Sequence, residues 1–202
     1  MNLKYLCSQF QKGRDLIFDL DNTLISENQF LYSAYLEIAK SISIDSSQEI
    51  YQFLFANFNQ YGRTKLYQKM SNKFLFNEFT LEKFLFLLRN HRPKKGLKIL
   101  PWFVDLMKMI KSDFNLYIIT NGNKTQQFNK IKSIKFPNNV SLKHVIYAND
   151  FNKKPNPESY LELAKIVNLN KPIYIGDSET DYLFALRSEI EFFDVKLLLL
   201  NK

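Results

Sequence analysis

Hydrophobic residues recur with two different periods along the chain. From about residue 28 to residue 92 they lie three and four positions apart, as in FLYSAYLEIAKSI and TLEKFLFLLRNH, which is typical of amphipathic helices. The rest of the chain alternates helical segments with four short apolar runs: DLIFDL, NLYIIT, HVIYAND and PIYIGD. Strands separated by helices predict an α/β fold, in which a parallel sheet carries helices on both faces. The helical block is therefore predicted to be an insertion after the first strand.

Polar residues stand where each predicted strand ends. Asp19 follows LIF, Thr120 follows LYII, residues 150–154 follow VIYAN, and Asp177 follows IYIG. The carboxyl ends of parallel strands lie along one edge of the sheet, where ligands bind. We therefore expect these four segments to converge on one cleft. Such a cleft would explain why Asp19 and Asp21 interrupt the most hydrophobic early segment of the chain.

The composition is that of a folded globular chain, because 202 residues with 46% hydrophobic side chains can bury a sizeable core. Cys7 is the single cysteine, and His91 and His144 are the two histidines, so we expect neither an internal disulfide nor a structural zinc site. No stretch approaches the roughly 20 apolar residues of a membrane span, and the first residues lack the apolar segment of a signal peptide. These features predict a cytoplasmic protein without a membrane segment.

The formal net charge is +8, from 28 Lys and Arg against 20 Asp and Glu. Such a charge admits attraction to polyanions or to small phosphorylated molecules. The lysines are scattered, however, and no run of like charge forms a basic arm. This distribution favours a solvated basic surface over a nucleic-acid-binding face.

The polar strand ends also carry motifs of a known family. FDLDNTL at 18–24 resembles the first motif of the haloacid dehalogenase (HAD) superfamily, Asp-x-Asp-x-Thr, and IITNG at 118–122, KPNP at 154–157 and GDSETD at 176–181 resemble the second, third and fourth motifs in order. One Asp-x-Asp pair is a weak signal, since turns after strands often contain such residues. Four ordered motifs are specific. The resemblance implies a Rossmann-like core domain over residues 1–26 and 93–202, with an α-helical cap domain over 27–92.

The resemblance also implies catalytic roles for the first motif. Asp19 would be the nucleophile that attacks phosphorus and forms an aspartyl-phosphate intermediate. Asp21 would protonate the leaving alkoxide and then accept a proton from the water that hydrolyses the intermediate. Thr23 would brace this loop by hydrogen bonding.

The resemblance also implies residues that bind Mg²⁺ and residues that bind the negatively charged phosphate. Mg²⁺ would be held by Asp19, the backbone carbonyl of Asp21, and Asp177, while Asp181 would orient the ion's waters or the nearby lysine. Phosphate oxygens would be bound by catalytic residues Thr120 and Lys154, and by the backbone N–H groups of Asn121 and Gly122.

By this resemblance, the chain is expected to be a Mg²⁺-dependent phosphomonoester hydrolase acting on a small phosphorylated metabolite, such as a sugar phosphate or a nucleotide. Two alternatives stay open: a phosphomutase of the same superfamily, and a noncatalytic basic binding module. Asp21 argues against a true dehalogenase, which has no leaving oxygen to protonate. One departure from the family pattern is local, because Ser188 and Glu189 stand where a small residue and a glycine usually precede the next strand.

Overall fold

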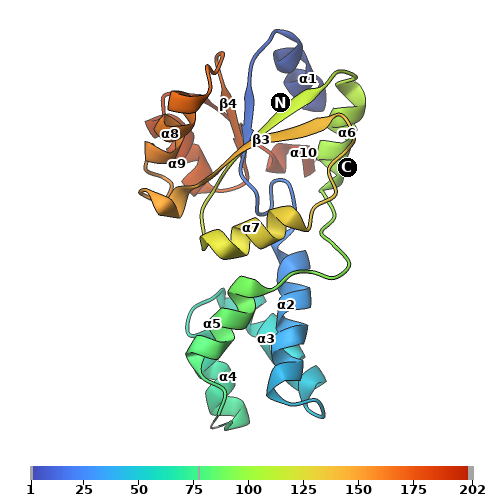
Figure 1. The fold of residues 1–202 in the computed structure, drawn as a ribbon, viewed down its shortest axis with the longest axis vertical. Helices are drawn as coiled ribbons and strands as arrows, with labels where there is room; N and C mark the ends of the chain where they lie inside the picture. Colours follow the sequence, from blue (N-terminus) through green and yellow to red (C-terminus); the bar gives the residue numbers. More distant parts are fainter. Residues whose placement is uncertain (1, 77, 200–202) are drawn as a thin grey trace.

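The computed structural model describes residues 2–76 and 78–199 and contains a five-stranded parallel sheet in the order β3-β2-β1-β4-β5 (Figure 1). The strands are β1 (Leu16–Phe18), β2 (Phe114–Thr120), β3 (Val140–Tyr147), β4 (Ile173–Gly176) and β5 (Glu191–Asp194). The predicted α/β class is therefore confirmed, and the four apolar runs supply β1 to β4. None of the described helices is long and apolar enough to cross a membrane.

Helices cover both faces of the sheet. Successive residues of a strand point to opposite faces, so each strand contributes side chains to both helical layers. Ile17 of β1 packs with residues of α8 (Glu158–Ile166) and α9 (Glu179–Arg187). Phe18 points the other way and belongs to the larger core, which includes residues of α1 (Leu3–Gln11) and α6 (Pro101–Met109). Figure 1 shows these two helical layers on either side of the strands, with the short α10 (Lys196–Leu199) beside α6.

The register of the strands aligns the carboxyl ends of β1, β2 and β4, where three of the predicted motifs lie. Phe18 is paired with Ile118 on one side and with Ile175 on the other. The Asp19 N–H continues this ladder by donating to the Ile175 carbonyl at 2.9 Å. The residues that follow each strand therefore emerge side by side at the carboxyl edge of the sheet, as parallel pairing requires.

The predicted helical segments between residues 28 and 92 correspond to α2 (Glu27–Ile42), α3 (Ser47–Tyr61), α4 (Leu66–Phe74) and α5 (Leu81–Asn90). Apolar residues four positions apart on α2, such as Phe30, Ala34 and Ile38, are buried and form the stripe that the spacing predicts. Thr80 caps α5, because its hydroxyl accepts a hydrogen bond from the Lys83 N–H at 3.2 Å. In Figure 1 this bundle lies beyond the carboxyl edge of the sheet, with α7 (Lys124–Lys132) between them.

The elements of the core that were not predicted from the pattern include α1, the edge strand β5 and the short α10. The departure before β5 leaves the turn intact, because Glu189 adopts a positive φ of 55°, the conformation for which glycine is usually chosen. The Ile190 N–H then donates to the Ala185 carbonyl at 3.0 Å and closes the turn. The chain thus enters β5 without the glycine.

Candidate active site

A cavity of about 250 Å³ opens at the carboxyl edge of the sheet. Its lining comes from four separate segments of the chain: Asp19, Asp21, Asn22, Thr120, Asn121, Lys154, Asp177, Ser178, Thr180 and Asp181. The structure therefore brings together the predicted residues of all four motifs. Thr23 and Gly122 are not among the lining residues, and no described residue of α2–α5 is either.

Lys154 is the central cation of the cavity. Its side chain is buried, and its Nζ lies 2.7 Å from Asp19 Oδ1, from Asp181 Oδ1 and from the Tyr174 hydroxyl. Burial disfavours the charged ammonium, but the two carboxylates outweigh this effect and raise the pKa of Lys154. A buried charge is tolerated when it is paired and hydrogen-bonded in this way. The ammonium is thereby fixed beside Asp19.

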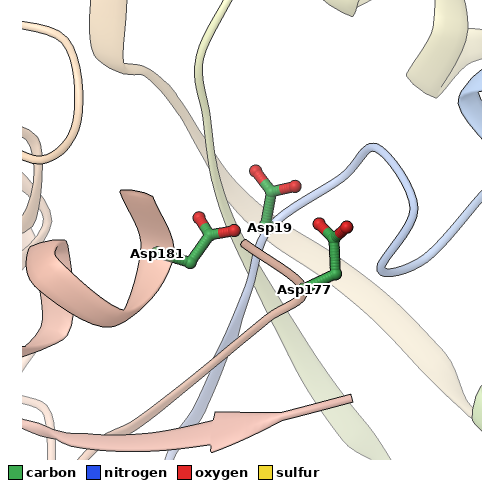
Figure 2. Close-up of side chains that lie close together, drawn as sticks. All are labelled: Asp19, Asp177 and Asp181. Carbon is green, nitrogen blue, oxygen red and sulfur yellow. The ribbon is translucent and has the colours of Figure 1, made fainter. Parts of the chain in front are cut away.

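Three carboxylates share this part of the cavity (Figure 2). Asp19, Asp177 and Asp181 each offer one oxygen within 4.8 Å of the others. Burial raises the pKa of Asp19 to about 7 in spite of Lys154, and burial together with the neighbouring Asp181 raises the pKa of Asp177 to about 6. Such crowding favours protonation, or a cation that shares the carboxylate oxygens.

Asp181 is oriented by the start of α9. Its Oδ2 accepts hydrogen bonds from the Ser178 hydroxyl at 2.6 Å and from the Ser178 N–H at 3.2 Å. The Asp181 N–H donates back to the Ser178 hydroxyl, so the pair forms a capping box. Because one oxygen caps the helix and the other accepts from Lys154, Asp181 holds the lysine in place.

Asn121 joins the second and third motifs through its side chain. The Lys154 N–H donates to Asn121 Oδ1 at 2.8 Å, and Asn121 Nδ2 donates to the Lys154 carbonyl at 3.1 Å. The expectation for Gly122 needs correction, since its N–H donates to Asn149 Oδ1 at 2.8 Å and is already occupied. The backbone donor expected at Gly122 is therefore not available to phosphate in this structure.

The prediction for Thr23 is wrong in its detail. The Thr23 hydroxyl is buried, and within the described part of the chain it has no hydrogen-bond partner. Its carbonyl braces the loop instead, by accepting a hydrogen bond from Trp102 Nε1 at 2.9 Å. The N–H groups of Leu24 and Ile25 also bond back to the Leu20 carbonyl. Backbone groups, not the threonine hydroxyl, hold the first loop.

Sequence comparison decides the family of this fold and cavity. The profile of the haloacid dehalogenase-like hydrolases matches residues 16–195, which is most of the chain. The chain belongs to this family. Among curated protein sequences, none matches it. As a HAD-family hydrolase, it places residues of all four segments that resemble the family's motifs on the cavity wall described above.

Solved structures of HAD proteins share the fold. The HAD-hydrolase YfnB from Bacillus subtilis, bound to magnesium, has a TM-score of 0.55 and 18% identity, covering 89% of this chain and 86% of its own. A protein of Lactobacillus plantarum assigned as a phosphoglycolate phosphatase has a TM-score of 0.53 and 19% identity, and the match covers 89% of this chain and 84% of its own. A protein of Thermotoga maritima assigned as a beta-phosphoglucomutase has a TM-score of 0.62 and 17% identity, and the match covers 90% of this chain and 84% of its own. Dehalogenase structures also match.

Three side chains around the HAD motifs were missed by sequence reasoning. Tyr174 of β4 donates its hydroxyl to the Ile119 carbonyl at 2.9 Å and lies beside Lys154. Gln127 and Lys130 of α7 both contact Asp21. The one available signal was the three-residue spacing of Gln127 and Lys130, which places both on one face of a helix. Scattered lysines elsewhere in the chain made Lys130 resemble a solvated residue.

Proposed function

We propose that this HAD-family hydrolase is a Mg²⁺-dependent phosphomonoester hydrolase that acts through an aspartyl-phosphate on Asp19. The observation that carries the proposal is the placement of two carboxylates on one cavity wall with different partners. Asp19 is held by Lys154, whereas Asp21 is held by Lys130 and Gln127 from another direction of the fold. Two carboxylates in separate environments can take separate roles, one as nucleophile and one as proton donor.

In the first step, an Asp19 oxygen attacks phosphorus, the ester P–O bond breaks, and Asp21 gives its proton to the leaving alkoxide. Lys154 keeps the Asp19 carboxylate in place beside the incoming phosphate. Thr120 and the Asn121 N–H are the groups proposed to bind phosphate oxygens. In the second step, Asp21 takes a proton from water as the water oxygen attacks phosphorus, which releases inorganic phosphate and restores the Asp19 carboxylate.

The carboxylate cluster supports a Mg²⁺ site. Asp19, Asp177 and the backbone carbonyl of Asp21 are the groups we propose as ligands, since Asp181 already bonds to Lys154 and Ser178. Oxygen donors of this kind suit Mg²⁺. Burial raises the pKa values of Asp19 and Asp177, which fits carboxylates that Lys154 alone does not neutralise. When bound, the ion supplies the charge that lets a carboxylate approach a phosphate.

We propose residues 27–92 as a cap domain over a core domain of residues 1–26 and 93–202. The described lining of the cavity comes from the core alone, so the phosphoryl group would bind to the core and the rest of the substrate would face the helices. The substrate would be a small metabolite such as a sugar phosphate or a nucleotide. The YfnB structure is described as revealing interdomain movement, which is consistent with a cap that opens and closes.

A phosphomutase is the second candidate, because it would use the same residues and the Thermotoga maritima relative is assigned to that activity. The two differ in where the phosphoryl group goes after Asp19. A mutase returns it to a sugar phosphate and needs a bisphosphate to start, whereas a hydrolase passes it to water. Isomerised sugar phosphate without net phosphate release would favour the mutase.

The test is phosphate release from a panel of sugar phosphates, nucleotides and other small phosphomonoesters, with Mg²⁺ or with EDTA. We expect turnover in Mg²⁺ that EDTA abolishes, and loss of at least about 1,000-fold in Asp19→Asn, because removal of a covalent nucleophile leaves only binding effects. Asp15→Asn, a change just before β1 and away from the cavity, is the matched control. Undiminished turnover in Asp19→Asn would refute the proposal, and salt-sensitive anion binding without turnover would favour the binding module.

A further inference from the structure

Lys130 is fully buried, yet it lies in the last turn of α7 among lysines that face solvent. Its Nζ is 2.7 Å from Asp21 Oδ1 and 2.6 Å from Asp21 Oδ2. Taking an ammonium out of water is costly unless an opposite charge and good geometry compensate. A lysine that only stabilised α7 would keep its charge in water. The whole Lys130 side chain is buried instead, and its ammonium contacts the Asp21 carboxylate of the cavity.

Gln127 approaches the same carboxylate from one turn earlier on α7. Its Nε2 donates to Asp21 Oδ2 at 2.9 Å and to the Thr120 hydroxyl at 2.8 Å. Residues three apart share a helix face, so α7 presents two adjacent donors to Asp21. Gln127 and Lys130 together contact both carboxylate oxygens of Asp21 and fix the plane of the group.

We propose that Lys130 and Gln127 are positioning residues for Asp21. The inference rests on the proposed function, in which Asp21 donates its proton to the leaving oxygen and later accepts one from water. Proton transfer requires the donor within hydrogen-bond reach of the leaving atom, and small displacements of a catalytic group cost rate steeply. Asp21 follows a strand on a loop and is partly exposed, so its side chain needs such external anchors.

The same ammonium also touches the helical insertion. Lys130 Nζ lies 4.9 Å from the centroid of the Phe30 ring, and Phe30 is a buried residue of α2. The Phe30 ring in turn packs edge-on against His91 just after α5, with centroids 5.5 Å apart. Lys130 therefore contacts both Asp21 and the first helix of the insertion.

The experiment compares kcat/KM for two esters of nearly the same shape, phenyl phosphate and 4-nitrophenyl phosphate. The nitro group makes the second leaving group far less dependent on protonation, and kcat/KM reports only the steps up to departure of the alcohol. The variants are Lys130→Met, Lys130→Arg, Asp21→Asn and the double variant Asp21→Asn/Lys130→Met. Lys132→Met, an exposed lysine on the same helix, is the matched control.

In Lys130→Met we expect kcat/KM for phenyl phosphate to fall about 100-fold, the lower range for loss of general acid catalysis, and the value for 4-nitrophenyl phosphate to fall less than about 10-fold. Asp21→Asn should give the same pattern, and the double variant should lose little more than either single one. Lys130→Arg should recover part of the phenyl phosphate activity, and Lys132→Met should resemble the wild type.

Equal losses on both esters, or additive losses in the double variant, would overturn the positioning role while leaving the proposed function standing. Failure of the wild type to release phosphate in Mg²⁺ from these two esters and from every compound of the panel above would overturn both. Thermal unfolding of the same variants provides a readout that does not use turnover. Asp21→Asn should lower the melting temperature in the wild-type background and should not lower it further once Lys130 is Met. A second decrease of equal size would show that Lys130 does not hold this carboxylate.

Discussion

Asp19 combines burial, a cationic partner and carboxylate neighbours in one side chain. The pKa of this group is raised to about 7 by burial, and Asp181 and Asp21 add to the effect, while Lys154 opposes it. A folded-state pKa above the ordinary value of the unfolded chain means that the folded protein holds a proton that the unfolded chain releases. Without a metal, this contribution to stability is therefore present at acid pH and is lost as the pH rises through about 7.

Mg²⁺ affinity should increase as the pH rises, because the ion competes with the protons on the Asp19 and Asp177 carboxyl groups. With the pKa of Asp19 at about 7 and that of Asp177 at about 6, we expect the Mg²⁺ affinity to rise by at least about 10-fold between pH 5.5 and pH 8. Isothermal titration calorimetry at several pH values measures this change. Asp177→Asn should weaken binding and flatten the profile. An affinity independent of pH would contradict the assignment of these ligands.

Lys154→Met should destabilise the protein strongly, since it leaves two buried carboxylates without their cation. We expect a loss of about 3–5 kcal/mol in the free energy of unfolding at pH 7.5, measured with urea in metal-free buffer. At pH 5 the loss should shrink, because Asp19 is then protonated in the folded state. Lys153→Met alters an exposed neighbour and should stay within about 0.5 kcal/mol of the wild type. A Lys154→Met variant of ordinary stability would contradict the buried ion pairs.

At this scale, sequence predicts the residue types at strand ends and not their hydrogen bonds. Asp19, Asp177 and Lys154 could be placed because parallel strands align their ends, whatever the loops do. The bonding of Thr23 and Gly122 could not, because it depends on how Trp102 and Asn149 pack. Trp102 donates to the Thr23 carbonyl and leaves the hydroxyl unpaired, and Asn149 occupies the Gly122 N–H. Lys130 also escaped notice, since its burial depends on how α7 crosses the sheet edge.

Space is tight at the junction between β4 and α9. A Cβ added at Gly176 would lie 2.5 Å from Asp181 Cβ and 2.6 Å from Asp181 Cγ, distances that real contacts do not reach. The absence of a side chain at Gly176 therefore allows the first turn of α9 to approach the strand. Asp181 reaches Lys154 only because of this approach.

Gly176→Ala should therefore displace Asp181 and disturb Lys154. We expect destabilisation of about 1–3 kcal/mol, the usual cost of overpacking, and a fall in kcat larger than the rise in KM, because Asp181 holds Lys154 and does not bind the leaving group. Thermal unfolding and steady-state kinetics on the same preparation test both effects. Wild-type values for both would show that the strand and helix can separate without cost.

Element prediction succeeded where periodicity was strong. The insertion's helices and β1 to β4 follow from apolar spacing alone. The edge strand β5, with the sequence EFFD, is short and has charged ends, so its pairing with β4 is decided by the sheet and not by its own pattern. The helix α1 was missed because its short apolar stripe, including Leu6 and Cys7, is buried only by packing with the sheet.

For the whole molecule, the main functional question is how the helical insertion and the cavity cooperate. The described cavity wall contains no residue of α2–α5, while Arg92 after α5 donates to Asn129 of α7 at 3.0 Å. Attack on phosphorus requires that water be excluded, and hydrolysis of the intermediate requires that water be admitted. A cap that moves between these steps would meet both requirements.

Binding of Mg²⁺ and beryllium fluoride, a mimic of phosphate on Asp19, should therefore slow amide hydrogen exchange at the connections 20–26 and 91–100 and on the insertion's face toward the core. Exchange measured by mass spectrometry, with Asp19→Asn as the control that does not form the complex, tests this expectation. Identical exchange with and without the mimic would count against closure of the cap.

The most direct test of the central claim is to trap the phosphorylated aspartate. A single turnover with substrate labelled in its phosphate is quenched in acid, digested with trypsin and analysed by mass spectrometry. We predict a hydroxylamine-labile label on the peptide of residues 15–40, which contains Asp19, with a longer-lived label in Asp21→Asn and none in Asp19→Asn. Turnover without this label, or a label that persists in Asp19→Asn, would contradict the assignment of Asp19 as the nucleophile.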